Sequence, residues 1–145
     1  MILYLDTSAL VKSYIREAGS LDVENWINQA DHLGSSAIAF VELASTLTKI
    51  ARLGFILPAE AQSEWKRFQQ DWLSFKQIVV SESVIQQAGL LAWQYPLRGY
   101  DAIHLSAALT LQQTVGEWVT LATFDRQLWQ AAKQTGLGVL PEVLV

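Results

Sequence analysis

The chain has 145 residues, 51% of them hydrophobic and only 17% charged, and this length predicts one domain with a sizeable core over residues 1–145. The absence of cysteine excludes disulfides and zinc-thiolate sites. Because the chain has no apolar run of membrane-spanning length and no secretory signal pattern, we expect a cytoplasmic protein without membrane contact. The net charge of −4 argues against a large basic nucleic-acid surface, but it is compatible with a small site where metal ions carry the positive charge.

The chain opens on an uninterrupted apolar run, Ile2-Leu3-Tyr4-Leu5, which is typical of a central strand buried on both faces. Asp6 ends this run, and the residues after it predict a helix from Ser8 to about Arg16. A carboxylate after a parallel strand lies where open α/β sheets bind ligands, and a buried one needs a positive partner, such as a cation. Taken alone, Asp6 is equally compatible with a simple helix N-cap.

Helical and strand patterns alternate along the rest of the chain. Strands are expected over 31–36, 78–80, 118–122 and 139–140, and helices over 20–29, 40–53, 58–75, 82–94, 100–113 and 125–134. The helix after Leu57 carries an aromatic stripe, which we expect in the core or at a protein interface: Trp65, Phe68, Trp72 and Phe75. Short strands alternating with helices predict an α/β fold with a doubly wound parallel sheet.

Four of the fourteen acidic residues stand in apolar surroundings or at element ends: Asp6, Glu42, Asp101 and Asp125. The fold should collect at least three of them at one end of the sheet, where their repulsion would raise their pKa values unless a divalent cation binds. Oxygen ligands favour Mg²⁺ or Mn²⁺ over zinc, and such a site suits phosphodiester cleavage. Each residue also has a simpler explanation, as an N-cap at Asp101 and Asp125 or a solvated side chain at Glu42.

Four segments of the chain resemble the acidic motifs of PIN-domain ribonucleases, and most closely those of the VapC-type toxins of bacterial toxin–antitoxin pairs. The segments are Asp6-Thr7-Ser8-Ala9-Leu10-Val11-Lys12, Val41-Glu42-Leu43, Arg98-Gly99-Tyr100-Asp101-Ala102-Ile103-His104-Leu105 and Thr123-Phe124-Asp125-Arg126-Gln127-Leu128. They span almost the whole chain. The resemblance implies a three-layer α/β/α fold of the PIN type with a short, mostly parallel central sheet.

The resemblance also implies a function, a metal-dependent endoribonuclease that cleaves RNA. In this family the acidic residues form the catalytic site and bind Mg²⁺ or Mn²⁺, which corresponds here to Asp6, Glu42, Asp101 and Asp125, with Ser8 in support. The fourth position is the least uniform in such proteins. The implied partners are the RNA substrate, a cognate antitoxin and a second copy in a homodimer.

Several other polar residues have two explanations. Lys12, Arg98 and Arg126 could contact RNA phosphates beside the metal ions, or could be ordinary surface charges. His104 follows Asp101 by three residues on the same helix and could reach the site, but a packed histidine of an apolar helix is the favoured interpretation.

Two alternative functions belong to other classes. A haloacid-dehalogenase-type phosphatase, also Mg²⁺-dependent, needs a second Asp two residues after the first, where this chain has Ser8. A PIN-like scaffold could bind RNA or protein without cleaving it, although the intact acidic positions favour catalysis. Housekeeping PIN nucleases share the same acids, so the nuclease chemistry and the toxin role are separate predictions.

Overall fold

The computed structural model describes residues 1–145, and a five-stranded, wholly parallel sheet lies at its centre in the order β3-β2-β1-β4-β5. The strands are β1 (Ile2–Leu5), β2 (His32–Ser36), β3 (Lys76–Ile78), β4 (Val119–Ala122) and β5 (Gly138–Leu140). β1 is the middle strand, and its Tyr4 lies opposite Gly34 of β2 and Leu121 of β4. All four β1 residues are buried, as the apolar run at the start of the chain predicts.

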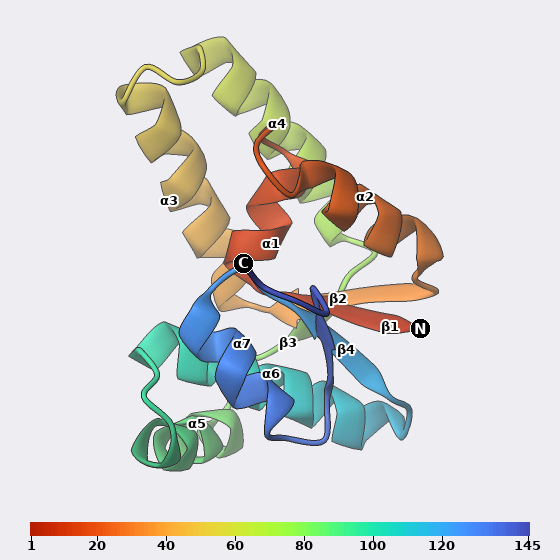
Figure 1. Cartoon of the computed structure of the whole chain (residues 1–145). Helices are drawn as coiled ribbons and strands as arrows, with labels where there is room; N and C mark the ends of the chain where they lie inside the picture. Colours follow the sequence, from red (N-terminus) through yellow and green to blue (C-terminus); the bar gives the residue numbers. More distant parts are fainter.

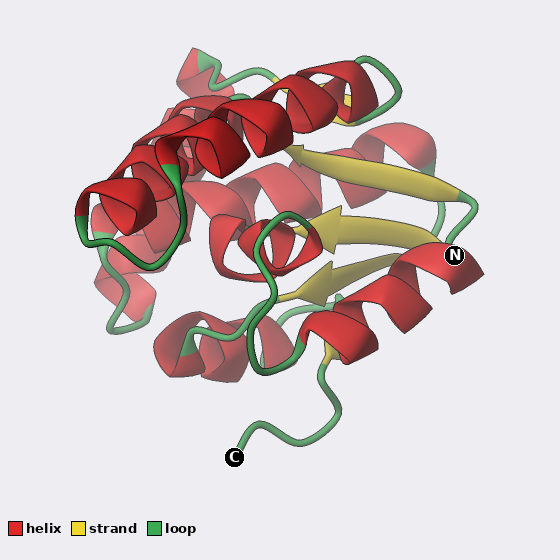
Figure 2. Cartoon of the chain, turned by 90° about the horizontal axis from the view of Figure 1, so that it is seen from above, coloured by secondary structure: helices red, strands yellow, loops and turns green.

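Helices cover both faces of this sheet (Figures 1 and 2). One layer contains α1 (Thr7–Leu10), α2 (Ser20–Gln29), α3 (Ile38–Arg52) and α4 (Pro58–Trp72), and α3 and α4 form a hairpin that projects away from the sheet. The opposite layer contains α5 (Glu82–Gln94), α6 (Gly99–Val115) and α7 (Arg126–Lys133). The predicted three-layer α/β/α fold is confirmed. No helix combines the length and the apolar character that a membrane crossing requires.

The sheet separates two hydrophobic cores, and β1 contributes to both because successive strand residues face opposite sides. Leu3 and Leu5 pack with α1–α4, whereas Ile2 and Tyr4 pack with the α5–α7 layer. The predicted aromatic stripe of α4 and the turn after it belongs to the first core: Phe68, Trp72 and Phe75 are buried, and Trp65 packs against them partly buried.

The first helix is shorter than predicted. α1 gives way to a 3-10 turn, η1 (Val11–Ser13), and the chain does not remain helical to Arg16. Ser20 explains the early end, because its hydroxyl accepts the N–H of Glu17 at 3.0 Å and donates to the carbonyl of Ile15 at 3.3 Å. A side chain that binds these backbone groups competes with the helix for them.

The third strand is also displaced from its predicted position. The β-branched run predicts a strand over 78–80, but β3 ends at Ile78, which lies opposite Ser36, the last residue of β2. Val79 lies beyond this pairing and is exposed. The neighbouring strand, rather than β-propensity, therefore sets the end of β3.

α6 packs tightly against the sheet and carries two site residues towards β1. A Cβ atom on Gly34 of β2 would lie 2.8 Å from Cδ2 of Leu111 in α6, so any larger residue at this position would force the Leu111 side chain to shift. α6 ends at Val115 and is capped by Gly116, whose φ of 74° lies in the left-handed region that favours glycine. This close packing brings Asp101 and His104 of α6 to the carboxyl ends of the strands.

Candidate active site

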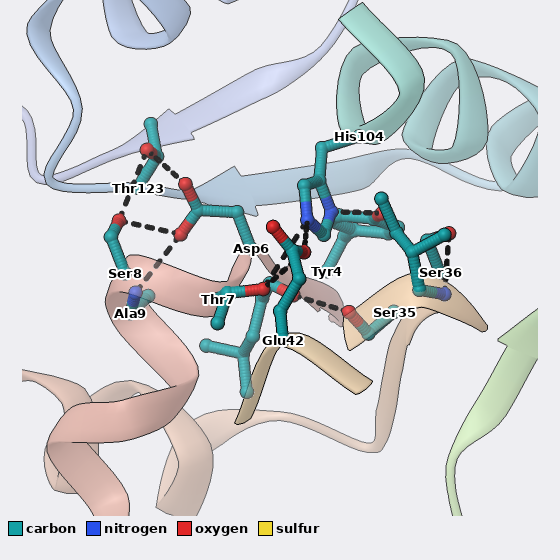
Figure 3. Close-up of polar contacts among 12 residues, drawn as sticks. Tyr4, Asp6, Thr7, Ser8, Ala9, Ser35, Ser36, Glu42, His104 and Thr123 are labelled. Atoms are coloured by element: carbon teal, nitrogen blue, oxygen red, sulfur yellow. Dashed lines mark hydrogen bonds and ion pairs between the residues drawn. The ribbon is translucent and has the colours of Figure 1, made fainter. Parts of the chain in front are cut away.

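Asp6 is a buried carboxylate at the carboxyl end of β1, with only 2% of its surface exposed. Its Oδ1 accepts hydrogen bonds from the Ala9 N–H at 2.9 Å and the Ser8 hydroxyl at 2.7 Å, and its Oδ2 accepts one from the Thr123 hydroxyl at 2.5 Å (Figure 3). Burial raises the pKa of Asp6, against the opposing effects of the nearby His104 and of these hydrogen bonds. Asp6 is therefore both the N-cap of α1 and a carboxyl group held inside the protein.

Ser8 and Thr123 join the ends of the neighbouring strands β1 and β4. Besides its bond to Asp6, the Ser8 hydroxyl accepts the Phe124 N–H at 2.9 Å. Ser8 therefore holds Asp6 and the residue that follows Thr123, and its supporting role in a metal site stays a prediction. Thr123 was not singled out from the sequence, although a polar residue directly after an apolar strand, two positions before Asp125, is a signal for it.

Asp101 and Asp125 share one guanidinium group. Nε of Arg98 lies 3.2 Å from Oδ2 of Asp101, and Nη2 of Arg98 lies 2.6 Å from Oδ2 of Asp125. Asp125 also caps α7, because its Oδ1 accepts the Leu128 N–H at 3.0 Å. Burial, followed by the negative charges of Asp125 and Asp6, raises the pKa of Asp101, and Arg98 only partly offsets this. The carboxylates of Asp6, Asp101 and Asp125 therefore interact electrostatically at one end of the sheet.

Glu42 lies in the second turn of α3 and has partners of its own (Figure 3). Its Oε1 accepts the Thr7 hydroxyl at 2.7 Å and lies 2.8 Å from Nε2 of His104. Burial alone would raise the pKa of Glu42, but hydrogen bonding and charge from His104, together with the Thr7 bond, outweigh burial and lower it. His104 is a packed, buried histidine as expected, yet it also contacts a candidate site residue.

Of the three basic residues considered for RNA contacts, Arg98 contacts the candidate site carboxylates, Asp101 and Asp125, and the other two do not. The Lys12 ammonium group instead binds the Glu17 carboxylate at 2.9 Å, and it lies over the ring of Phe124. The Arg126 guanidinium donates to the backbone carbonyl of Leu144 at 3.1 Å. Arg98 is therefore the basic side chain placed directly beside the carboxylates.

The carboxylate and hydroxyl oxygens of Asp6, Asp101, Asp125 and their neighbours are suitable ligands for a divalent cation that binds oxygen. As the side chains stand, no three carboxylate or imidazole groups converge on one point. Arg98 binds Asp101 and Asp125, and the Thr123 hydroxyl binds Asp6. Burial raises the pKa values of Asp6 and Asp101, and for Asp101 the negative charges of Asp125 and Asp6 raise it further, so a bound cation would stabilise the ionised form of both carboxylates. Carboxylate and hydroxyl oxygens without cysteine suit Mg²⁺ or Mn²⁺ better than zinc.

A family model described as the PIN domain matches residues 3–134. Since this match covers most of the chain and the fold agrees with it, the chain belongs to the PIN-domain family. The acidic residues on which the resemblance rests thus lie within a fold of the expected kind.

Curated relatives narrow the comparison to ribonucleases named VapC. Ribonuclease VapC49 of Mycobacterium tuberculosis is 33% identical to this chain over 147 residues, which cover 99% of the chain and 97% of the relative. Ribonuclease VapC3 of Pyrobaculum aerophilum is 32% identical and covers 88% of the chain and 92% of the relative. The predicted similarity to VapC-type proteins is confirmed.

Solved structures share the fold. A toxin–antitoxin complex from Klebsiella pneumoniae contains a chain with a TM-score of 0.70 and 17% identity, and 99% of both chains is covered. The VapBC2 complex from Rickettsia felis, bound to a DNA fragment from its promoter, gives a TM-score of 0.66 at 16% identity, with 96% of this chain and 97% of that chain covered. At these identities the similarity shows the fold.

Proposed function

We propose that this protein is a divalent-metal-dependent endoribonuclease that acts as one nuclease domain on RNA phosphodiester bonds. The observation that carries the proposal is the buried, hydrogen-bonded carboxylate of Asp6, beside Asp101 and Asp125, in a PIN-domain chain whose curated relatives are ribonucleases. Asp6, Glu42, Asp101 and Asp125 would hold Mg²⁺ or Mn²⁺. When bound, the ion supplies charge stabilisation at the phosphate and lowers the pKa of an attacking water.

The surrounding residues hold the acidic groups for this task. Thr123, Ser8 and the Ala9 N–H fix both oxygens of Asp6, so its orientation does not depend on the ion. Arg98 holds Asp101 and Asp125, and its side chain is 72% exposed, which leaves it accessible to a phosphate. Guanidinium groups bind phosphate oxygens readily, and such contacts position a nucleic acid without reading its sequence.

We also propose that the protein is the toxin of a type II toxin–antitoxin pair. Nearly full-length similarity to curated VapC ribonucleases and a fold shared with toxin–antitoxin complexes support this role. The cytoplasmic partners would be RNA, a cognate antitoxin protein and a second copy of the chain. Large apolar side chains such as Trp93, which is 91% exposed on α5, favour a protein partner.

The test is cleavage of total RNA by the purified full-length protein. We expect cutting with Mg²⁺ or Mn²⁺, none with EDTA, and none with the Asp6→Asn variant, which keeps the size and the capping ability of the side chain. Cutting that survives EDTA or Asp6→Asn would contradict the proposed chemistry. RNA binding without cutting by folded, metal-loaded protein would favour a binding scaffold.

A further inference from the structure

His104 connects the interior of the protein to Glu42. The imidazole belongs to α6 and is 1% exposed, with Nδ1 2.7 Å from the Tyr4 hydroxyl and Nε2 2.8 Å from Oε1 of Glu42 (Figure 3). The Tyr4 and His104 rings meet edge to face, with centroids 5.8 Å apart. Three elements, β1, α3 and α6, therefore meet through one ring.

The partners of the ring select one tautomer. The Tyr4 hydroxyl lies 2.7 Å from Nδ1, and a tyrosine hydroxyl, with an ordinary pKa of about 10, carries at neutral pH a proton that it can donate to this nitrogen. A neutral imidazole that accepts at Nδ1 carries its own proton on Nε2. Nε2 faces the carboxylate of Glu42, which when ionised is an acceptor only. The opposite tautomer would place a lone pair against that oxygen.

The geometry points to His104 as the positioning residue for Glu42, with Tyr4 setting the tautomer that lets Nε2–H hold the carboxylate. The Thr7 hydroxyl completes the arrangement, since it donates to the same Oε1 at 2.7 Å and lies 3.3 Å from Nε2 of His104. Oε1 is thus held by two donors, and Oε2 is left for a ligand. The inference rests on the proposed function, in which Glu42 belongs to the metal-binding set.

This arrangement does more than fill space. A packed histidine needs only partners for its two nitrogens, whereas here one partner is the Glu42 carboxylate oxygen that also accepts the Thr7 hydroxyl. A carboxylate held in one orientation is what an oxygen-coordinated cation requires. Groups that orient ligands in this way tune metal affinity without touching the ion.

The tautomer can be measured independently of catalysis. The chain contains two histidines, and His32 is exposed at the start of β2. In the imidazole ¹H–¹⁵N spectrum, the ring signals of His104 therefore report on the site, and those of His32 are an internal reference. We expect neutral His104 to be protonated on Nε2, and Tyr4→Phe to reduce this preference. A wild-type spectrum with the proton on Nδ1 would overturn the inference.

Mn²⁺ affinity, measured by calorimetry on the full chain, tests the role. We expect His104→Leu to weaken binding about tenfold or more, His104→Gln to recover part of the loss through its amide N–H, and His32→Gln to bind like the wild type. Tyr4→Phe keeps the ring but loses the hydroxyl, and it should weaken Mn²⁺ binding less than His104→Leu does. It tests the positioning role if His104→Leu does not fold. Wild-type affinity in a folded His104→Leu variant, or equal losses in the Leu and Gln variants, would reject positioning.

These outcomes separate the inference from the proposed nuclease activity. If the wild type binds Mn²⁺ and His104→Leu weakens it but no RNA is cut, the positioning role stands and the proposed activity fails. If Asp6→Asn abolishes cutting while His104→Leu leaves Mn²⁺ affinity unchanged, the proposed function stands and the positioning role fails. A wild-type protein without Mn²⁺ affinity would contradict both.

Discussion

Thr123 Oγ1 lies 2.5 Å from Asp6 Oδ2, although 117 positions separate the two residues in the chain. The contact exists because β1 and β4 are adjacent and parallel, so the residues that follow them emerge at the same edge of the sheet. Since Ser8 and the Ala9 N–H hold the other oxygen, the buried carboxylate has one orientation. Four experiments test what this architecture implies.

Replacing Thr123 by valine should weaken both the site and the fold. Valine keeps the shape but removes the donor to Asp6 and the acceptor of the Asp125 N–H. We expect RNA cleavage to fall about tenfold or more, and the free energy of unfolding in urea to fall by about 1–3 kcal/mol. Thr123→Ser keeps the hydroxyl and is the control. Equal behaviour of the Val and Ser variants would show that the hydroxyl does not act on Asp6.

Asp6→Asn should stabilise the protein at neutral pH while abolishing cleavage. The folded-state pKa of Asp6 is raised above its ordinary value of 3.8, so at neutral pH its buried charge opposes folding. Lowering the pH through the raised pKa protonates Asp6 and removes this penalty, so the advantage of the variant should shrink towards pH 3.8. Urea unfolding at neutral and acidic pH measures this. An advantage that is independent of pH, or absent, would contradict the raised pKa.

Mg²⁺ or Mn²⁺ should raise the melting temperature of the wild type by several degrees, because binding to the folded state contributes about 2.7 kcal/mol at a hundredfold excess over Kd. Asp101→Asn removes a carboxylate that is repelled by Asp125 and Asp6, and should lose most of this shift. Glu117→Gln changes an exposed residue just before β4, at the end of that strand away from the site, and this variant should keep the full shift in melting temperature. The measurement is the melting temperature of each protein with metal and with EDTA. An equal shift in the wild type, Asp101→Asn and Glu117→Gln would show that the metal binds elsewhere.

Phe68→Ala should be strongly destabilising, because Phe68 is fully buried among the aromatic residues of α3 and α4. We expect a loss of about 3–5 kcal/mol in the free energy of unfolding. Leu73→Ala, at the end of the same helix and 83% exposed, should change it by no more than about 0.5 kcal/mol. Similar losses in urea unfolding would contradict the assignment of the stripe to the core.

Local sequence patterns are sufficient to predict an α/β fold with a doubly wound parallel sheet. The apolar run Ile2–Leu5 predicts a strand buried on both faces, and the spacing of Phe68 and Trp72 predicts the buried face of α4. Both follow from hydrophobic periodicity, which short segments carry by themselves. Boundaries were less predictable: Ser36 decides where β3 ends, and the Ser20 side chain binds backbone groups that would extend the first helix.

For the site, the sequence by itself determined which acidic residues to consider, because motifs around Asp6, Glu42, Asp101 and Asp125 carry the family resemblance. The tertiary structure decided which residues bind and orient these acidic side chains. Strand order brings Thr123 to Asp6, and the close packing of α6 brings His104 between Tyr4 and Glu42. Such contacts depend on strand pairing and on the rotation of a packed helix, and these are set by the whole core rather than by any segment.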